Sequence, residues 1–184
     1  MKKQYENIRT HYSSLSLNQV QLLKIAFGIC AIFASAQISI PLKPIPVTFQ
    51  SAMVLLIGFL YPPKQSFLTV MLYIIFGIVG LPIFAKFSHG INYLGGMTAG
   101  YLIGMLISAP IIGMLWSKMN DSWCSVFFIS TLAHTIIFFS GFCWLANLIG
   151  VYSAIYSGFL VLIPTGLLKV VLFTYLFSIL KAFR

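Results

Sequence analysis

A single positive charge stands inside an apolar run near the end of the chain. Lys169 closes the stretch LIPTGLLK and is followed by VVLF. An ionised side chain within a membrane span costs about 2.5–3.5 kcal/mol on insertion scales, so such residues tend to mark a site. The chain holds two acids, Glu6 and Asp121, and both are expected on the far side of the membrane. A small bound anion, such as a carboxylate, could supply the missing counter-charge; snorkelling of Lys169 to the surface is the alternative.

Other polar side chains in the apolar runs give weaker indications. Tyr73 and His134 are more typical of satisfied core residues than of ligand-binding ones, and no acid or thiol stands at a catalytic spacing from His134. The three cysteines are isolated from one another, which indicates no metal site. The sequence lacks the GxxxxGK[ST] motif for binding a nucleotide. It also shows no internal repeat and no catalytic pair. These absences favour a small binding subunit, energised by another protein, without a metal or cofactor of its own.

The elements that must position Lys169 are membrane helices. The chain has 184 residues, of which 60% are apolar and only 7% are charged, and its mean hydropathy is +1.00. A soluble domain carries about 25% charged residues, so the surrounding solvent is expected to be lipid. The net charge of +9 is interpreted as membrane topology rather than as nucleic-acid binding. We predict an all-α membrane protein with spans near 20–39, 47–61, 66–82, 95–116, 124–149 and 165–180.

The distribution of cations predicts the orientation of these spans. Eight lysines and arginines fall in the N-terminal segment and in alternate loops, against two, Lys43 and Lys86, in the opposite loops. Because cytoplasmic loops are enriched in such residues, both termini are predicted to be cytoplasmic. Residues 1–19 form a cytoplasmic segment and 20–184 the membrane domain, in a multi-pass protein of the cell inner or plasma membrane. The proline loop at 40–47 and the 150–163 segment, interpreted as a loop with a possible short helix, then face outward, and Lys169 lies just inside the outer face.

Two stripes of small residues indicate close helix packing. Gly96, Gly100, Gly104 and Ser108 recur every four residues, which lets two helix backbones approach in lipid, and internal packing is the favoured interpretation. A weaker stripe on the first span comprises Gly28, Ala31 and Ser35. The sequence alone does not decide whether this second stripe packs internally or docks a partner protein.

Four motifs, in order and at consistent spacing, resemble the BioY family. They are ISIPLKPIPVTFQ, YIIFGIVGLPIFA, GGMTAGYLIG and LIPTGLLK, and the resemblance covers about residues 20–180. BioY proteins are the biotin-specific substrate-binding (S) components of energy-coupling-factor (ECF) transporters. The chain departs from the family pattern in its last motif, usually PGDLLK, where Gly166 stands in place of the aspartate. The loop that begins with Lys86 and Phe87 is bulkier and more basic than the usual glycine-rich one.

The resemblance implies a six-helix domain with a biotin pocket near the outer face. Its partners would be a transmembrane coupling protein and two cytoplasmic ATPase subunits, and Gly28, Ala31 and Ser35 would dock the coupling protein. On this basis Lys169 attracts the ligand's charge or anchors its polar end, with Thr165 as a weaker substitute for the missing aspartate. The other expected binding residues are Thr48, Gln50, Tyr73, Phe84, Ser88, Asn92, Thr98 and Tyr101, of which Tyr73 and Phe84 would contact the bicycle.

Alternatives to biotin binding remain open from the sequence. One is an S component for another vitamin, such as riboflavin or thiamine, and another is a non-transporting membrane scaffold. An intramembrane enzyme is less favoured because no catalytic pair can be named. The proline loop is further expected to act as a lid that orders over bound vitamin near Lys43.

Overall fold

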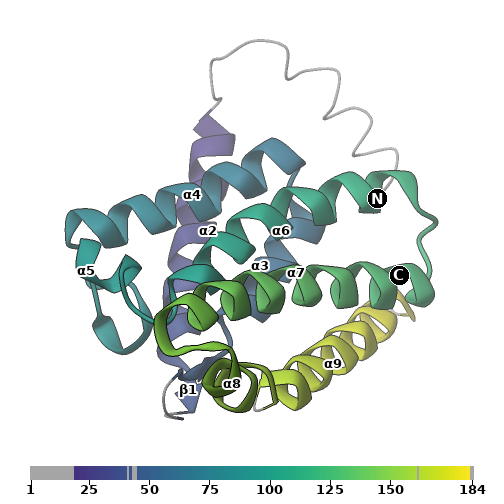
Figure 1. Ribbon diagram of the computed structural model, residues 1–184. Coiled ribbons are helices and arrows are strands. Elements are labelled where there is room, and N and C mark those ends of the chain that lie inside the picture. The colour runs from purple at the N-terminus through teal and green to yellow at the C-terminus, as the bar shows by residue number, and fades with distance from the viewer. Residues whose placement is uncertain (1–18, 41, 43–44, 161, 183–184) are drawn as a thin grey trace.

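The computed structural model describes residues 19–40, 42, 45–160 and 162–182, and most of them are helical (Figure 1). The expected lid position, Lys43, lies outside the described residues. The elements in chain order are α2 (Gln19–Gln37), β1 (Ser39–Ile40), β2 (Val47–Thr48), α3 (Gln50–Leu60), α4 (Pro63–Val79), the 3-10 turn η1 (Ala85–Phe87), α5 (Ile91–Leu94), α6 (Ala99–Lys118), α7 (Trp123–Ile149), α8 (Val151–Ala154), the π-helix η2 (Ile155–Leu160) and α9 (Leu162–Ala182).

Within the described residues, three helices, α2, α6 and α7, are long and apolar enough to cross a membrane, and the shorter apolar helices are Gln50–Leu60, Pro63–Val79 and Ile163–Phe177. The helices therefore support the prediction of a helical membrane protein. The count of six spans stays a prediction. The first five expected segments each coincide with one helix to within a few residues.

Two boundaries near the C-terminus differ from the prediction. The last helix begins at Leu162 rather than Thr165, so Pro164 lies within its first turn. Proline is tolerated there because the first backbone N–H groups of a helix have no intrahelical partner. The 150–163 segment was expected to be a loop with a possible short helix. The short helix is present as α8, but the helical structure then continues as a π-helix through Leu160, a rare form that is frequent at functional sites.

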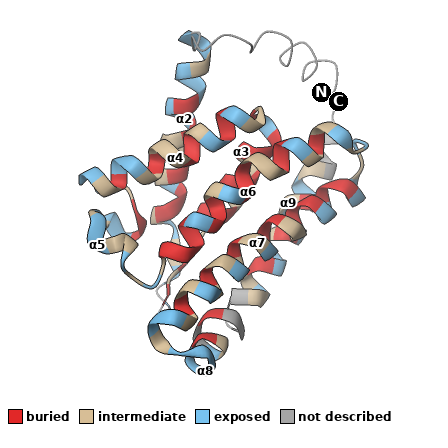
Figure 2. Cartoon of the chain, turned by 45° about the horizontal axis from the view of Figure 1, so that its top comes forward, coloured by how far each residue is buried: buried red, intermediate tan, exposed pale blue. Residues whose placement is uncertain are grey.

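Helix α6 lies at the centre of the bundle. In its most apolar 18-residue window, 61% of α6 is buried, whereas the corresponding window of α2 is 28% buried. Figure 2 shows buried residues along much of the length of α6. A Cβ added at Gly100 would overlap the Cβ of Trp144, and one added at Gly104 would come within 2.7 Å of the Ile137 Cα. The packing role predicted for these two glycines is confirmed, since only a hydrogen at these positions lets α7 approach so closely.

A short hairpin joins α2 to α3. Strands β1 and β2 pair antiparallel, with Ser39 opposite Thr48 and Ile40 opposite Val47. The Phe49 N–H extends the pairing by donating to the Ile38 carbonyl at 3.1 Å. The prolines around this region favour extended backbone, and the sequence predicted an extended loop here without its strand pairing.

The turn after α4 contains two residues in the left-handed region. Lys86 has φ 57° and ψ 36°, and Phe87 has φ 57°. Left-handed backbone costs a residue with a side chain roughly 1–2 kcal/mol. Two such residues in succession therefore need contacts from the rest of the protein to hold them.

Candidate functional site

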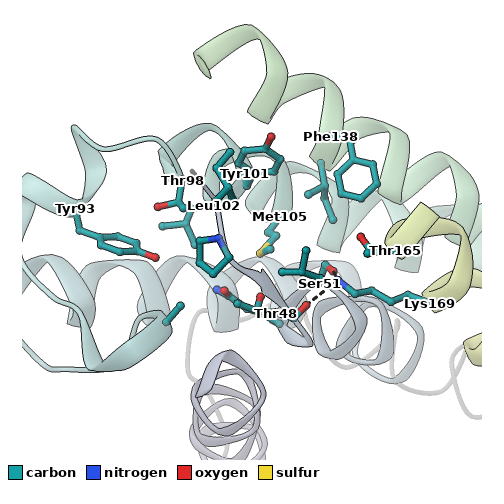
Figure 3. Close-up of a pocket in the computed structure, with 16 residues that line it drawn as sticks. Thr48, Ser51, Tyr93, Thr98, Tyr101, Leu102, Met105, Phe138, Thr165 and Lys169 are labelled. Atoms are coloured by element: carbon teal, nitrogen blue, oxygen red, sulfur yellow. Dashed lines mark hydrogen bonds between the residues drawn. The ribbon is translucent and has the colours of Figure 1, made fainter. Parts of the chain in front are cut away.

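One cavity brings together residues from several separate parts of the chain (Figure 3). Its walls are β2 with the start of α3, Ala85 of the η1 turn, Tyr93 of α5, the first turns of α6, and facing residues of α7 and α9. Six of the ten expected binding residues line it: Thr48, Gln50, Thr98, Tyr101, Thr165 and Lys169. The structure thus gathers residues up to 121 positions apart, although their contact with a ligand stays a prediction.

Lys169 is the cation of this cavity. Its ammonium group donates to the Thr48 carbonyl at 2.7 Å and to the Ser51 hydroxyl at 2.9 Å. Both acceptors are neutral, so the hydrogen bonds orient the ammonium but do not cancel its charge. An ammonium has three N–H donors, and these two bonds leave one for a ligand. The side chain is half-buried and its polar end meets protein oxygens, which argues against the snorkelling alternative.

Two residues that line the cavity each carry a buried polar atom without a hydrogen-bond partner in the described part of the protein. These atoms are the Gln50 side-chain nitrogen and the Tyr101 hydroxyl, on residues that are 6% and 7% exposed. Leaving a buried polar group unpaired costs about 1–3 kcal/mol. An amide and an ammonium on the walls of one apolar cavity suit a ligand with several oxygen atoms on a hydrophobic body.

The aromatic residues around the η1 turn form two layers, of which only the inner one faces the cavity. Tyr73 and Phe84 are 0% and 1% exposed and lie behind the wall, so the structure does not bring them to the cavity. The Phe84 ring stacks on Tyr93 with centroids 4.6 Å apart, and it is Tyr93 that faces the cavity. Burial raises the pKa of Tyr93, partly offset by its hydrogen bond with Thr98, so its hydroxyl stays neutral.

Ser88 and Asn92 are not among the residues that line the cavity. Ser88 follows the η1 turn, where its N–H bonds to the Ala85 carbonyl and its carbonyl accepts from the Phe84 N–H. Asn92 lies on the exposed side of the single-turn helix α5. Both were expected at the wall beside the fourth span, but the turns between η1 and α6 place Tyr93 there instead.

Several residues at the cavity were not expected from the sequence, among them Ser51, Tyr93, Met105, Ile137 and Phe138. Met105 lies one helical turn after Tyr101, so the helical period could have identified it. Ser51 directly follows the expected Gln50 in the first turn of α3. Nothing in the sequence around Ile137 and Phe138 distinguishes them from the other apolar residues of α7.

The cavity is narrow. Its volume of about 50 Å³ holds a few ordered waters, each of which needs roughly 10–15 Å³. A bicyclic vitamin is many times larger than one water, so the shape of the walls bears directly on its entry and release. Among the described residues, no group of three or more His, Cys, Asp or Glu is placed to hold a metal ion.

The small-residue stripe expected to dock a partner faces inward in part. Gly28 is buried, and a Cβ there would come within 2.7 Å of the Thr69 methyl carbon. Ser35 is 5% exposed and donates to the Ile32 carbonyl, while Ala31 is half-buried. A second stripe of small residues at four-residue spacing is exposed on the same helix and comprises Ala26, Cys30 and Ala34.

The fold and site define a class of membrane-embedded small-molecule binding proteins. A solved chain described as the S-component for biotin from an ECF-type ABC transporter superposes with a TM-score of 0.79 over 91% of this chain and 95% of that chain, at 22% identity. FolT bound with folic acid gives a TM-score of 0.60 over 90% of each chain, at 16% identity. At such identities the likeness establishes the fold alone.

Sequence comparison gives the family. The BioY family model matches residues 7–184. The chain is 42% identical over 177 residues to a probable biotin transporter BioY from Rickettsia prowazekii, covering 96% of this chain and 91% of the relative. It is 33% identical over 145 residues to one from Pyrococcus horikoshii, covering 79% and 86%. The chain belongs to the BioY family, and the resemblance inferred from the four motifs is confirmed.

Proposed function

We propose that this chain is the substrate-binding subunit for biotin uptake, delivering the vitamin with an ATP-driven coupling module. The observation that carries the proposal is Lys169, a half-buried cation whose hydrogen-bond acceptors are both neutral, at a cavity of the BioY fold. Biotin joins a carboxylate to an apolar bicycle with a ureido group, which suits a cation, unpaired polar atoms and an aromatic wall. Transport by a non-catalytic subunit also agrees with the absence of a nucleotide-binding motif from the sequence.

The proposed arrangement in the cell is a multi-pass protein of the inner or plasma membrane. Both termini lie in the cytoplasm and the cavity opens toward the outer face, with the cation asymmetry of the loops in support. Helices α3, α4 and α9 would complete six spans with α2, α6 and α7. Single cysteines placed in successive loops of a chain without its native cysteines, and labelled from outside intact cells, test this topology; labelling at the turn around Lys118 from outside would contradict it.

The proposed partners are a transmembrane coupling protein and two cytoplasmic ATPase subunits. We keep α2 as the docking helix, but the burial of Gly28 and Ser35 moves the proposed contact to the exposed stripe of Ala26, Cys30 and Ala34. Small exposed residues at this spacing permit close approach of another helix in lipid. A bulky side chain on this stripe distinguishes docking from ligand binding: Ala34→Phe should abolish co-purification with the coupling protein while leaving biotin binding intact.

Radiolabelled biotin uptake tests the whole proposal. Cells that carry this chain together with a coupling module should accumulate biotin, and a comparison without the module shows whether the chain moves biotin alone. Mass spectrometry of the small molecule retained after purification separates biotin from riboflavin or thiamine. A scaffold without a ligand predicts no thermal protection by any vitamin, and that result would overturn the proposal.

A further inference from the structure

We propose that Gln37 is a positioning residue that holds one wall of the cavity and so governs how fast the ligand leaves. Gln37 is the last residue of α2. Its side-chain nitrogen donates to the Phe84 carbonyl at 3.1 Å, and its side-chain oxygen accepts from the Phe87 N–H at 3.1 Å. The amide therefore spans the η1 turn from one end to the other, and a third contact, to the Phe33 carbonyl at 3.3 Å, ties it to its own helix.

The turn that Gln37 spans is the strained one. Lys86 and Phe87 both have φ 57°, and such conformations persist only where surrounding contacts over-determine them. Two of those contacts are the hydrogen bonds from Gln37. A third is the edge-to-face packing of the Phe87 ring on Phe33 of α2, with centroids 6.1 Å apart. Without the amide, the Phe87 N–H and the Phe84 carbonyl lose the partners that fix the turn's shape.

This turn carries a wall of the cavity. Ala85, within the turn, lines the cavity directly, and so does Tyr93. Tyr93 is in turn supported by the stacked ring of Phe84, whose carbonyl is the acceptor for Gln37. A shift of the turn would therefore move Ala85 and release the ring that backs Tyr93.

The end of α2 also governs the opposite wall. Strand β1 begins two residues after Gln37, and its Ser39 pairs with Thr48, whose carbonyl accepts from Lys169. Both walls thus start from the same helix end. The positions of these two walls therefore bear on how a ligand enters and leaves the cavity. The strained turn, held by the hydrogen bonds of Gln37 together with two backbone hydrogen bonds of Ser88, is the wall that Gln37 controls. This inference rests on the proposed biotin-binding function.

The test compares Gln37→Leu with wild type in the purified full chain. Leucine keeps the approximate size of the side chain and removes all three hydrogen bonds. Radiolabelled biotin should dissociate about tenfold faster, the change expected when a pair of neutral hydrogen bonds is lost. In ligand-free protein, the peptide covering residues 84–90 should exchange its amide hydrogens faster. The matched control is Asn147→Leu, since Asn147 is an exposed amide whose side-chain nitrogen donates to the Cys143 carbonyl in its own helix; both quantities should equal those of wild type.

A second variant distinguishes positioning from general stability. Asparagine adopts left-handed backbone more readily than lysine, so Lys86→Asn added to Gln37→Leu should return the dissociation rate toward wild type. Loss of packing at the end of α2 would not be rescued by a change at position 86. If Gln37→Leu does not fold, Gln37→Glu is measured instead, because the carboxylate still accepts from Phe87 but cannot donate to Phe84.

The outcomes separate this inference from the proposed function. Faster release and faster exchange in Gln37→Leu, with rescue by Lys86→Asn, support it. Wild-type dissociation in Gln37→Leu, or the absence of rescue, overturns it. A wild-type chain that retains no biotin refutes the proposed function, while hydrogen exchange in the ligand-free protein still tests whether Gln37 holds the turn.

Discussion

Replacing Lys169 by methionine tests the electrostatic basis of the site. Methionine keeps a long unbranched chain and removes the ammonium that donates to Thr48 and Ser51. We expect biotin binding to weaken at least tenfold, while the unliganded protein stays folded. Its thermal midpoint should hold or rise, because a half-buried cation without an opposite charge is itself destabilising and its removal offsets the two lost hydrogen bonds.

The magnitude follows from the one donor that the ammonium has left for a ligand. A hydrogen bond to a charged group contributes about 1.5–3 kcal/mol. Since 1.4 kcal/mol corresponds to a factor of ten, the loss should be about ten- to 150-fold in Kd. Lys118→Met is the control, because Lys118 is an exposed cation in the last turn of α6 and should change the Kd little.

A double-mutant cycle with two ligands identifies the ligand group that Lys169 meets. Titration of wild type and Lys169→Met with biotin and with its uncharged methyl ester gives four dissociation constants. If the ammonium pairs with the carboxylate, the ester binds wild type more weakly than biotin does, and the variant discriminates little between them. Equal losses for both ligands in the variant would place Lys169 at the ureido end. Unchanged biotin affinity would refute its central role.

Three further substitutions test other parts of the structure. Tyr101→Phe removes a buried hydroxyl without a partner in the described structure, so calorimetry should show equal or higher stability without ligand and about fivefold weaker biotin binding if that hydroxyl meets the ligand. Gly104→Leu places a side chain against Ile137, and its thermal midpoint should fall by several degrees, corresponding to about 1–3 kcal/mol of overpacking; an unchanged midpoint would contradict the close packing. Gly77→Ala puts a Cβ into the space of the Phe84 ring, so it should weaken biotin binding as well as stability, and an unaltered Kd would separate that ring from the site.

The sequence predicted the helices well because long apolar runs have few alternatives in lipid. The start of α9 was misplaced because Pro164 can occupy any position of a first turn, and the sequence does not say which. The lysine of the cavity was predictable from charge alone, since a cation among leucines and valines needs an explanation wherever the chain folds.

The layers of the site were not predictable in the same way. Tyr73, Phe84 and Tyr93 are all aromatic residues near the same turn, and only the packing of Phe84 on Gly77 decides that Tyr93 faces the cavity. The sequence likewise does not show which face of helix α2 points into the protein. The helix carries small residues on two faces, and its rotation is fixed by contacts of Gly28 with Tyr61 and Thr69, which belong to later parts of the chain.

The shortness of α3 determines the depth of the cavity. Its 11 residues rise about 16 Å, roughly half of the 30 Å hydrocarbon thickness of a bilayer. Non-helical backbone is tolerated at that depth only where protein covers it or a cavity borders it, and the hairpin that precedes α3 meets this condition at Val47 and Thr48. In the proposed orientation the vitamin would therefore sit below the lipid headgroups, where the low dielectric strengthens attraction between a carboxylate and an ammonium and makes capture weakly sensitive to external salt.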